Sequence, residues 1–230
     1  MTEIKHVFFD LDHTIWDFEK NSQEALVEIF DLHSSILRDV QYQLFYPKYK
    51  AINEQYWDLY RKNKVTKEEL RVGRFRDAFN LFGHSFEYDF LDQFAKDYLA
   101  RSPFKTNLFA DSHEVLTYLQ SKYELHIITN GFKDVQYIKL RESKLAAYFN
   151  VIVCSDEVGV KKPNPAIFKF AMQKANAKPE ESFMIGDCPD ADVKGALAVG
   201  MNAAWFNAEN KKNKYNLLEI SKLKSLYNFL

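Results

Sequence analysis

The sequence predicts an α/β fold, a Rossmann-like parallel sheet with a four-helix domain inserted after its first strand. Three observations support this prediction. Near the N-terminus a short apolar run, HVFF, ends abruptly in the acidic segment DLD. Residues 16–103 then show helical spacing of apolar side chains without a clear strand. From residue 104 onward, short β-branched runs alternate with helical segments, as is typical of parallel sheets with helices on both faces.

The predicted domains are therefore discontinuous along the chain. Residues 1–15 and 104–230 form the α/β core, and residues 16–103 form the helical insert. Ligands of such sheets bind beyond the carboxyl ends of the strands, so an insert that follows the first strand would overhang that edge. We expect the insert to act as a cap, a lid over the substrate.

Helical spacing and a start signal define the insert. Apolar residues repeat every three or four positions over residues 25–30 and 42–60. The segment TKEEL predicts a capping box, with Thr66 as N-cap and Glu69 three residues later. The aromatic stripe at 42–60 has the periodicity of a hydrophobic core.

The second half supplies the remaining strands and their helices. Four strands are predicted, over the segments ELHIITNG, FNVIVCSDEVG, SFMIGD and, last, MNAAWF. Asp111 with Glu114 predicts one helix start as a capping box, and Asn164 followed by Pro165 predicts another. Gly200 is expected to end the last of these helices.

Composition narrows the class of protein. The chain has 230 residues, of which 47% are hydrophobic, and a formal net charge of −1, so neither disorder nor a polyanionic partner is indicated. Two cysteines predict no disulfide framework, and no apolar stretch is long enough to span a bilayer. We expect a cytoplasmic monomer or homodimer that binds neither nucleic acid polymers nor membranes.

Polar residues follow four of the predicted strands, where parallel strands bring their carboxyl ends together. The segments are Asp10 and Asp12, Thr129-Asn130-Gly131, Ser155-Asp156, and Gly186-Asp187. Asp192 follows Asp187 by five residues, and Lys162 lies shortly after the third segment. In an extended strand, residues two apart point the same way, so Asp10 and Asp12 are placed to share one task.

Charge and donor type predict a metal site with phosphoryl chemistry. Four aspartates against one lysine leave a large negative excess, and a divalent cation is its simplest compensation. Oxygen donors suit Mg²⁺, and no histidine or cysteine has zinc-ligand spacing. With a lysine and a threonine hydroxyl on the phosphate, one aspartate can be the nucleophile and a second the general acid and base.

These motifs resemble those of the haloacid dehalogenase (HAD) superfamily of hydrolases, over essentially the whole chain. The matching segments are Asp10-Leu11-Asp12-His13-Thr14 for the DxDxT motif, Thr129-Asn130-Gly131 for the second motif, Lys162 before Pro163 for the third, and Gly186-Asp187 with Asp190 and Asp192 for the acidic fourth. Four motifs in order on an α/β pattern make this resemblance specific.

The resemblance implies a role for each motif residue. Asp10 would be the nucleophile and a metal ligand, and Asp12 the acid/base with its backbone carbonyl on the metal. Asp187 would complete the Mg²⁺ site, and Asp192 would orient Lys162 or metal-bound water. The residues implied to bind the phosphoryl group are Thr129, Asn130, Gly131 and Lys162. Haloalkanoate dehalogenases lack the second aspartate, so Asp12 implies a phosphatase or phosphomutase.

The insert suggests the substrate. Two segments, LDHTIWDFEKNSQEAL and LRVGRFRDAF, resemble the YjjG-like branch of 5′-nucleotidases, which act on pyrimidine nucleoside monophosphates. The resemblance implies that Asp17, Asn21 and Ser22 border the phosphate pocket. It also offers an alternative for the aromatic residues of the insert, which could stack on a nucleobase. Arg71, Arg74 or Arg76 would approach the substrate, or else form a solvated, salt-bridged helix face. A sugar-phosphate phosphatase or phosphosugar mutase stays the alternative enzyme, and a non-catalytic phosphate-sensing module ranks below both.

Overall fold

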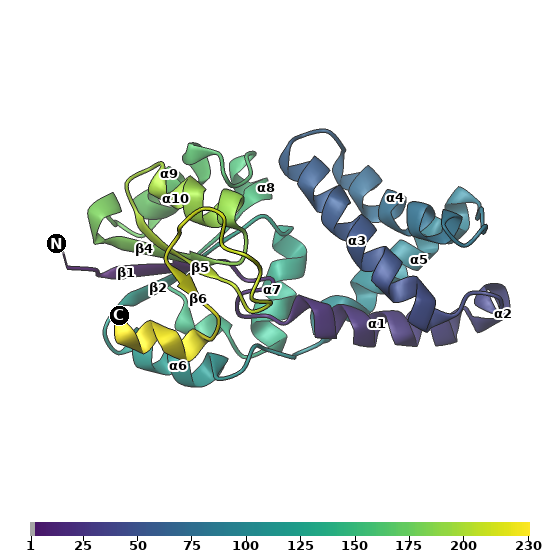
Figure 1. Cartoon of the computed structure of the whole chain (residues 1–230), viewed down its shortest axis with the longest axis horizontal. Coiled ribbons are helices and arrows are strands. Elements are labelled where there is room, and N and C mark those ends of the chain that lie inside the picture. The colour runs from purple at the N-terminus through teal and green to yellow at the C-terminus, as the bar shows by residue number, and fades with distance from the viewer. Residues whose placement is uncertain (1–2) are drawn as a thin grey trace. The chain divides into compact units, whose positions relative to one another are not determined.

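The structure, a computed structural model, describes residues 3–230, which form two compact units. One unit combines the chain up to Glu19 with Thr106–Leu230, and we call it the core unit. The other, Lys20–Lys105, is the helical unit. Figure 1 labels most helices and strands of both units.

A six-stranded parallel sheet forms the centre of the core unit and confirms the predicted α/β class. The strands are β1 (His6–Phe9), β2 (Glu124–Thr129), β3 (Val151–Cys154), β4 (Ser182–Gly186), β5 (Asn202–Phe206) and β6 (Glu219–Ile220). Their order is β3-β2-β1-β4-β5-β6. The chain moves outward from β1 in one direction and then crosses to its other side with β4. The carboxyl end of β1 is therefore a topological switch point, where α/β proteins bind ligands.

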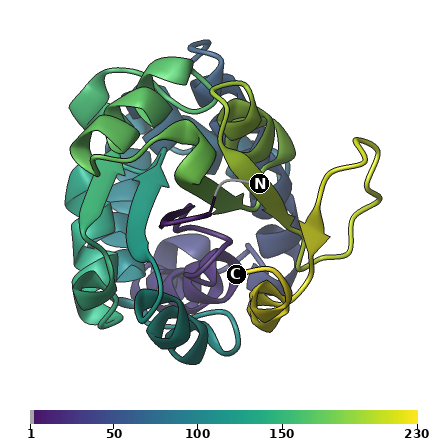
Figure 2. The same ribbon diagram turned by 90° about the vertical axis from the view of Figure 1, so that its left-hand side faces the viewer.

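Helices cover both faces of this sheet, as Figure 2 shows in a view along the strands. They are the α-helices α6 (Ser112–Gln120), α7 (Lys133–Glu142), α8 (Ser155–Val158), α9 (Pro165–Lys174) and α10 (Gly195–Leu197), the 3-10 helices η2 (Ala146–Tyr148), η3 (Pro179–Glu181) and η5 (Leu223–Asn228), and the π-helix η4 (Pro189–Lys194). Val7 and Phe9 pack with the α6 side, whereas Phe8 packs with the α9 side. This alternation along β1 explains why every residue of the strand is apolar or buried.

Two predictions about the core unit are wrong. MNAAWF is not the last strand, because the two-residue β6 adds to β5 through the pairs Trp205↔Glu219 and Phe206↔Ile220. So short a strand leaves no periodic pattern in the sequence. Asp111 precedes α6 but its side chain makes no capping hydrogen bond, because its backbone is left-handed (φ 65°). Lys224 instead lies 3.3 Å from its carboxylate.

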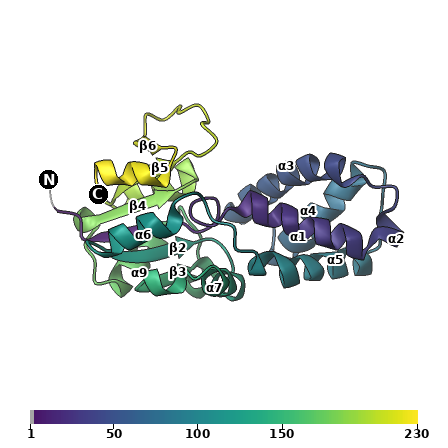
Figure 3. The ribbon, with the colours of Figure 1, turned by 90° about the horizontal axis from the view of Figure 1, so that it is seen from below.

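The helical unit contains the four predicted long helices and one short one, seen side by side in Figure 3. They are α1 (Phe18–Leu32), α2 (Ser34–Leu37), α3 (Tyr42–Arg61), α4 (Lys67–Asn80) and α5 (Tyr88–Arg101), followed by the turn η1 (Ser102–Phe104). Its core is rich in aromatic rings, with Phe45 and Phe79 at a centroid distance of 4.7 Å and Phe75 and Phe94 at 5.1 Å. Tyr49, from the aromatic stripe, is also buried there, which favours the interpretation of that stripe as core.

Local start signals account for two of the helices. At α4 the predicted capping box is present: Thr66 Oγ1 accepts the N–H of Glu69 at 3.1 Å, and the Thr66 N–H donates to Glu69 Oε2 at 2.7 Å. At α9, Asn164 Oδ1 accepts the N–H of Ala166 at 2.9 Å.

Among the helices of residues 3–230, none combines the length and apolarity that a membrane crossing requires.

Candidate active site

Asp10 stands where the buried strand β1 ends. Its backbone N–H donates to the carbonyl of Ile185 on β4 at 2.9 Å, which fixes the residue over the centre of the sheet. Its side chain is almost wholly withdrawn from solvent. An apolar strand between two others thus presents a carboxylate at its carboxyl end, the place where the sheet topology predicts a ligand.

Lys162 connects the acidic residues of two strands. Its Nζ donates to Asp10 Oδ1 and to the carbonyl of Ile128, each at 2.6 Å, and lies 2.6 Å from Asp192 Oδ1 as an ion pair. Burial lowers the pKa of an ammonium, but Asp10 and Asp192 outweigh burial and raise the pKa of Lys162 above its ordinary value. Lys162 therefore stays charged within the site.

Asn130 holds the backbone that carries Lys162. Its Oδ1 accepts the Lys162 N–H at 2.8 Å, and its Nδ2 donates to the Lys162 carbonyl at 3.1 Å. These two bonds occupy the side-chain amide. A contact between Asn130 and a phosphate would consequently have to come from its backbone.

Three carboxylates, those of Asp10, Asp187 and Asp192, lie close enough to hold one cation. Their oxygens fall within 4.8 Å of one another. Burial raises the pKa of Asp10 to about 8, Lys162 opposes this rise, and Asp192 and Asp187 add to it. With all three carboxyls ionised, three negative charges against one ammonium would leave two, which a divalent cation would balance and thereby keep Asp10 ionised. Carboxylate oxygens are hard donors, so the residues present fit Mg²⁺.

Gly186 allows Asp192 to reach this cluster. A Cβ on Gly186 would lie 2.3 Å from Asp192 Oδ2, so only glycine leaves room for the carboxylate. Asp192 Oδ2 also accepts the N–H of Cys188 at 3.0 Å. Asp190 is exposed and pairs with Lys194 at 2.7 Å instead. Within the acidic fourth motif, the Asp192 carboxylate thus belongs to the buried cluster, whereas the Asp190 carboxylate is exposed to solvent.

Asp12 is held apart from the other carboxylates by two residues of α7. Lys139 Nζ donates to its Oδ1 at 2.5 Å, and Gln136 Nε2 donates to its Oδ2 at 2.7 Å. Burial by itself raises the pKa of a carboxyl, but Lys139 and the two hydrogen bonds outweigh burial and lower the pKa of Asp12 below its ordinary value. Asp10 and Asp12 therefore sit in opposite electrostatic environments, two residues apart.

The hydroxyl oxygen of Thr129, at the end of β2, already accepts two hydrogen bonds. Its Oγ1 accepts the N–H of Gly131 at 3.0 Å and an N–H of Gln136 at 3.1 Å. Gln136 and Lys139 are not among the site residues predicted from the sequence, although the sequence carries one signal for them. They lie three residues apart next to Leu140, so two polar residues share the apolar, inward face of a predicted helix.

The remaining candidates belong to other segments of the chain. Asp156, which lies on the short helix α8, accepts the backbone N–H of Lys133 at 3.1 Å. Asp17 belongs to the core unit, where its N–H donates to the carbonyl of Asn107 at 3.0 Å. Asn21 belongs to the helical unit and is fully buried.

Ion pairs account for two of the three candidate arginines on α4. Arg71 pairs with Asp92, and Arg76 donates to Asp77 at 2.8 Å. Arg74 is buried and donates to Asn53 Oδ1 at 2.7 Å. The salt-bridged alternative therefore describes Arg71 and Arg76, while Arg74 is part of the interior of the helical unit.

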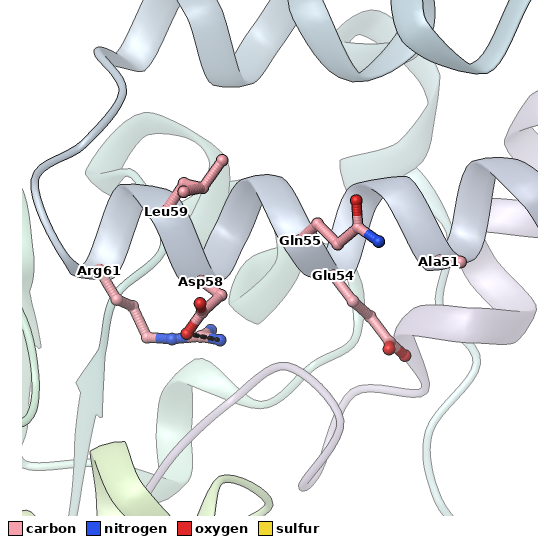
Figure 4. Close-up of a pocket in the computed structure, with 6 residues that line it drawn as sticks. All are labelled: Ala51, Glu54, Gln55, Asp58, Leu59 and Arg61. Atoms are coloured by element: carbon pink, nitrogen blue, oxygen red, sulfur yellow. Dashed lines mark ion pairs between the residues drawn. The ribbon is translucent and has the colours of Figure 1, made fainter.

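A hollow on the helical unit lies along one face of α3 (Figure 4). It is lined by Ala51, Glu54, Gln55, Asp58, Leu59 and Arg61. Asp58 and Arg61 face each other there at 3.9 Å. Its lining comes from one helix and includes none of the candidate catalytic residues, so we assign it no function.

The fold and this site together define a class: α/β hydrolases with an aspartate pair at the end of the first strand. Residues 4–200 match the sequence model of the haloacid dehalogenase-like hydrolases. The chain belongs to this family, and the resemblance drawn from its four motifs is confirmed.

Relatives of the chain extend over nearly its whole length. The pyrimidine 5′-nucleotidase PynA of Streptococcus pneumoniae is 31% identical over 91% of this chain and 86% of its own. The pyrimidine 5′-nucleotidase YjjG of Escherichia coli is 28% identical over 96% of this chain and 94% of its own. The crystal structure of the HAD-hydrolase YfnB of Bacillus subtilis, bound to magnesium, has a TM-score of 0.88 at 27% identity and covers 99% of this chain and 98% of that one.

Proposed function

We propose that this hydrolase is a Mg²⁺-dependent phosphomonoesterase that works through an aspartyl phosphate on Asp10. The observation that carries the proposal is the contrast between Asp10, buried with Lys162 and two further carboxylates, and Asp12, held by Lys139 two residues later. Two carboxylates in opposite environments suit two different tasks in one reaction.

The two aspartates divide the chemistry. In the form of the enzyme in which Asp12 carries a proton, an Asp10 oxygen attacks phosphorus, the bond from phosphorus to the leaving oxygen breaks, and Asp12 gives that oxygen its proton. Asp12 then takes a proton from water, whose oxygen attacks the aspartyl phosphate. Inorganic phosphate leaves, and Asp10 is regenerated. Lys162 and the Thr129 hydroxyl offset the negative charge of the phosphoryl oxygens during both steps.

Asp10 and Asp187, with the backbone carbonyl of Asp12, would hold the Mg²⁺ ion, and Asp192 would act through Lys162. When bound, the ion supplies positive charge that keeps Asp10 ionised and offsets charge on the phosphoryl group. The oxygen-only donors and the two uncompensated negative charges support this assignment.

We further propose that the substrate is a nucleoside 5′-monophosphate of the pyrimidine type, selected by the helical unit acting as a lid. The full-length similarity to two pyrimidine 5′-nucleotidases supports this choice over a sugar phosphate. The helical unit follows the nucleophile strand directly in the chain, which is the place for a segment that covers the phosphate.

Phosphate release over a panel of nucleoside 5′-monophosphates and sugar phosphates, with Mg²⁺ or with EDTA, tests these proposals. We expect pyrimidine nucleotides to give the highest kcat/KM and EDTA to abolish turnover. Asp10→Asn should lower kcat about a thousandfold or more, because it removes the nucleophile. Its melting temperature should stay close to that of the wild type, since the amide keeps the size of the carboxyl. Activity retained by Asp10→Asn would refute the mechanism, and preference for a sugar phosphate would refute the substrate.

A further inference from the structure

Two buried polar residues of α7 reach the loop that follows β1. Gln136 is fully buried and Lys139 is nearly so, and they lie one helical turn apart on the same face. Together they bind both oxygens of the Asp12 carboxylate, at 2.7 Å and 2.5 Å. Because each oxygen has a different donor, the carboxylate cannot rotate without breaking one of these bonds.

Gln136 extends this arrangement to Thr129. One of its amide hydrogens goes to Asp12 and the other to Thr129 Oγ1, at 3.1 Å. The opposite orientation of the amide would place its oxygen 2.7 Å from a carboxylate oxygen, so the network fixes the assignment. Thr129 Oγ1 also accepts the Gly131 N–H. A hydroxyl that accepts two hydrogen bonds must direct its own hydrogen elsewhere, which makes Thr129 a donor toward a phosphoryl oxygen.

The two residues are poorly explained by folding alone. The Oε1 atom of Gln136 is buried without a hydrogen-bond partner, which destabilises the folded chain. The Lys139 ammonium is buried 4.1 Å from the ring centroid of Trp16, and apolar residues often replace buried ion pairs without loss of stability. A leucine and a methionine would fill these two positions without burying the ammonium or the unpaired amide oxygen, and the Asp12 carboxylate is what requires the donors of Gln136 and Lys139.

We propose that Gln136 and Lys139 are positioning residues, which fix the acid/base carboxylate of Asp12 and orient the hydroxyl of Thr129. This inference rests on the proposed phosphatase function and deepens it. Both residues act through the side chains that they bind, Asp12 and Thr129. Lys139 acts on proton transfer to the leaving oxygen, whereas Gln136 acts on proton transfer and on binding of the phosphoryl group.

Leaving groups of different basicity separate these effects. The value of kcat/KM reports the steps up to departure of the first leaving group, and p-nitrophenolate departs without a proton, unlike an alkoxide. Lys139→Met should lower kcat/KM about 100-fold for a nucleoside 5′-monophosphate and far less for p-nitrophenyl phosphate. Gln136→Leu should lower both values, and the nucleotide value more, because Thr129 also loses its orientation.

A double-mutant cycle and a control on the same helix complete the experiment. In an Asp12→Asn background, Lys139→Met should cause no further loss of kcat/KM with the nucleotide, because its effect passes through Asp12. Lys133→Met, which removes a half-exposed lysine of α7 that pairs with Glu157, should leave both substrates unchanged. If Lys139→Met does not fold, Lys139→Gln, which keeps a donor of hydrogen bonds, takes its place.

The outcomes are distinguishable. Equal losses for both substrates in Lys139→Met, or additive losses with Asp12→Asn, would overturn the inference and leave the proposed phosphatase function standing. Absence of turnover of any phosphomonoester by the wild-type protein would instead overturn the proposed function and the inference together.

Discussion

Lys162 illustrates how one buried cation organises an acidic site. It contacts carboxylates that come from the ends of two different strands, Asp10 after β1 and Asp192 after β4, both at 2.6 Å. The attraction within a buried ion pair is largely offset by the loss of hydration of both charges. The contacts therefore contribute mainly to placement of Asp10, and the remaining negative charge of the cluster would favour binding of a cation.

Substitution of Gly186 by alanine tests whether the site requires the close packing of Asp192 against β4. In Gly186→Ala the new Cβ would overlap the Asp192 carboxylate, which Lys162 and the Cys188 N–H hold in place. We expect the free energy of unfolding to fall by about 1–3 kcal/mol. Affinity for Mg²⁺, measured by calorimetry, should fall as well, because Asp192 and Lys162 are displaced together.

Gly159→Ala is the matched control for this substitution. Gly159 has a positive φ of 77° but open space around the position of a Cβ. Only backbone strain is then introduced, about 1 kcal/mol, and affinity for Mg²⁺ should not change. Unchanged Mg²⁺ affinity in Gly186→Ala as well would show that Asp192 does not depend on this close packing.

The motif residues could be predicted from the sequence because each motif is local, whereas their partners could not. Asp10, Thr129 and Lys162 each stand at the end of a recognisable apolar run or beside a proline. Lys139 is separated by 127 residues from the aspartate that it binds. Only the pairing of β1 with β2 and the packing of α7 bring the two together, and no local pattern encodes that distance.

At the scale of elements, the capping box of α4 makes a measurable contribution. Thr66→Ala removes the acceptor for the Glu69 N–H, and we expect a loss of about 1 kcal/mol in the free energy of unfolding of the helical unit. Urea denaturation followed by circular dichroism measures this loss. Asp111→Asn at the start of α6 should have a smaller effect, since Asp111 makes no capping hydrogen bond and asparagine tolerates its left-handed backbone. Equal losses of unfolding free energy in Thr66→Ala and Asp111→Asn would contradict the assignment of a capping hydrogen bond to Thr66 alone.

Helix starts show why sequence signals succeed at some ends and fail at others. Thr66 and Asp111 both begin a segment with glutamate three residues later. The extended backbone of Thr66 directs its side chain at the helix N-terminus, but the left-handed backbone of Asp111 does not. The backbone conformation at the cap depends on the loop before it, which the four-residue pattern does not specify.

The neighbouring strands β1 and β2 also carry a buried pair of histidines toward their amino ends, opposite the site. His126 Nε2 lies 3.2 Å from His6 Nδ1, with Glu124 beside them. Burial, and secondly the nearby His6, lower the pKa of His126 from 6.5 to about 4. Between these pH values the unfolded chain binds more protons than the folded chain. Stability therefore falls as pH drops through this range, by about 3 kcal/mol in total.

Replacing His126 with phenylalanine should remove this dependence. Between pH 7 and pH 5 the wild type should lose about 2 kcal/mol more of its free energy of unfolding than His126→Phe. Urea titrations at both pH values, with Mg²⁺ present throughout, measure the difference. His113→Phe replaces an exposed histidine of the same unit and should behave as the wild type. If the free energy of unfolding of His126→Phe falls between pH 7 and pH 5 by as much as that of the wild type, His126 does not cause the pH dependence.

At the scale of the whole molecule, each unit has its own hydrophobic core. The sheet of the core unit packs on both faces, and the aromatic cluster of the helical unit is separate from it. The switch from strand–helix alternation to continuous helical spacing made the insertion predictable. Separate cores allow the two units to differ in local stability, so a ligand that binds within one of them can stabilise it selectively.

Mg²⁺ should therefore protect the core unit more than the helical unit. The cluster of Asp10, Asp187 and Asp192 lies wholly in the core unit, and a cation at 100 times its Kd stabilises the state that binds it by about 2.7 kcal/mol. Hydrogen exchange measured by mass spectrometry should slow in β1 and β2 when Mg²⁺ is added, and much less in α3 and α4. Asp187→Asn should abolish this response, whereas Asp190→Asn, which alters an exposed carboxylate paired with Lys194, should keep it. Protection that persists in Asp187→Asn would mean that the cation binds elsewhere, because the trio would then lack one of its three charges.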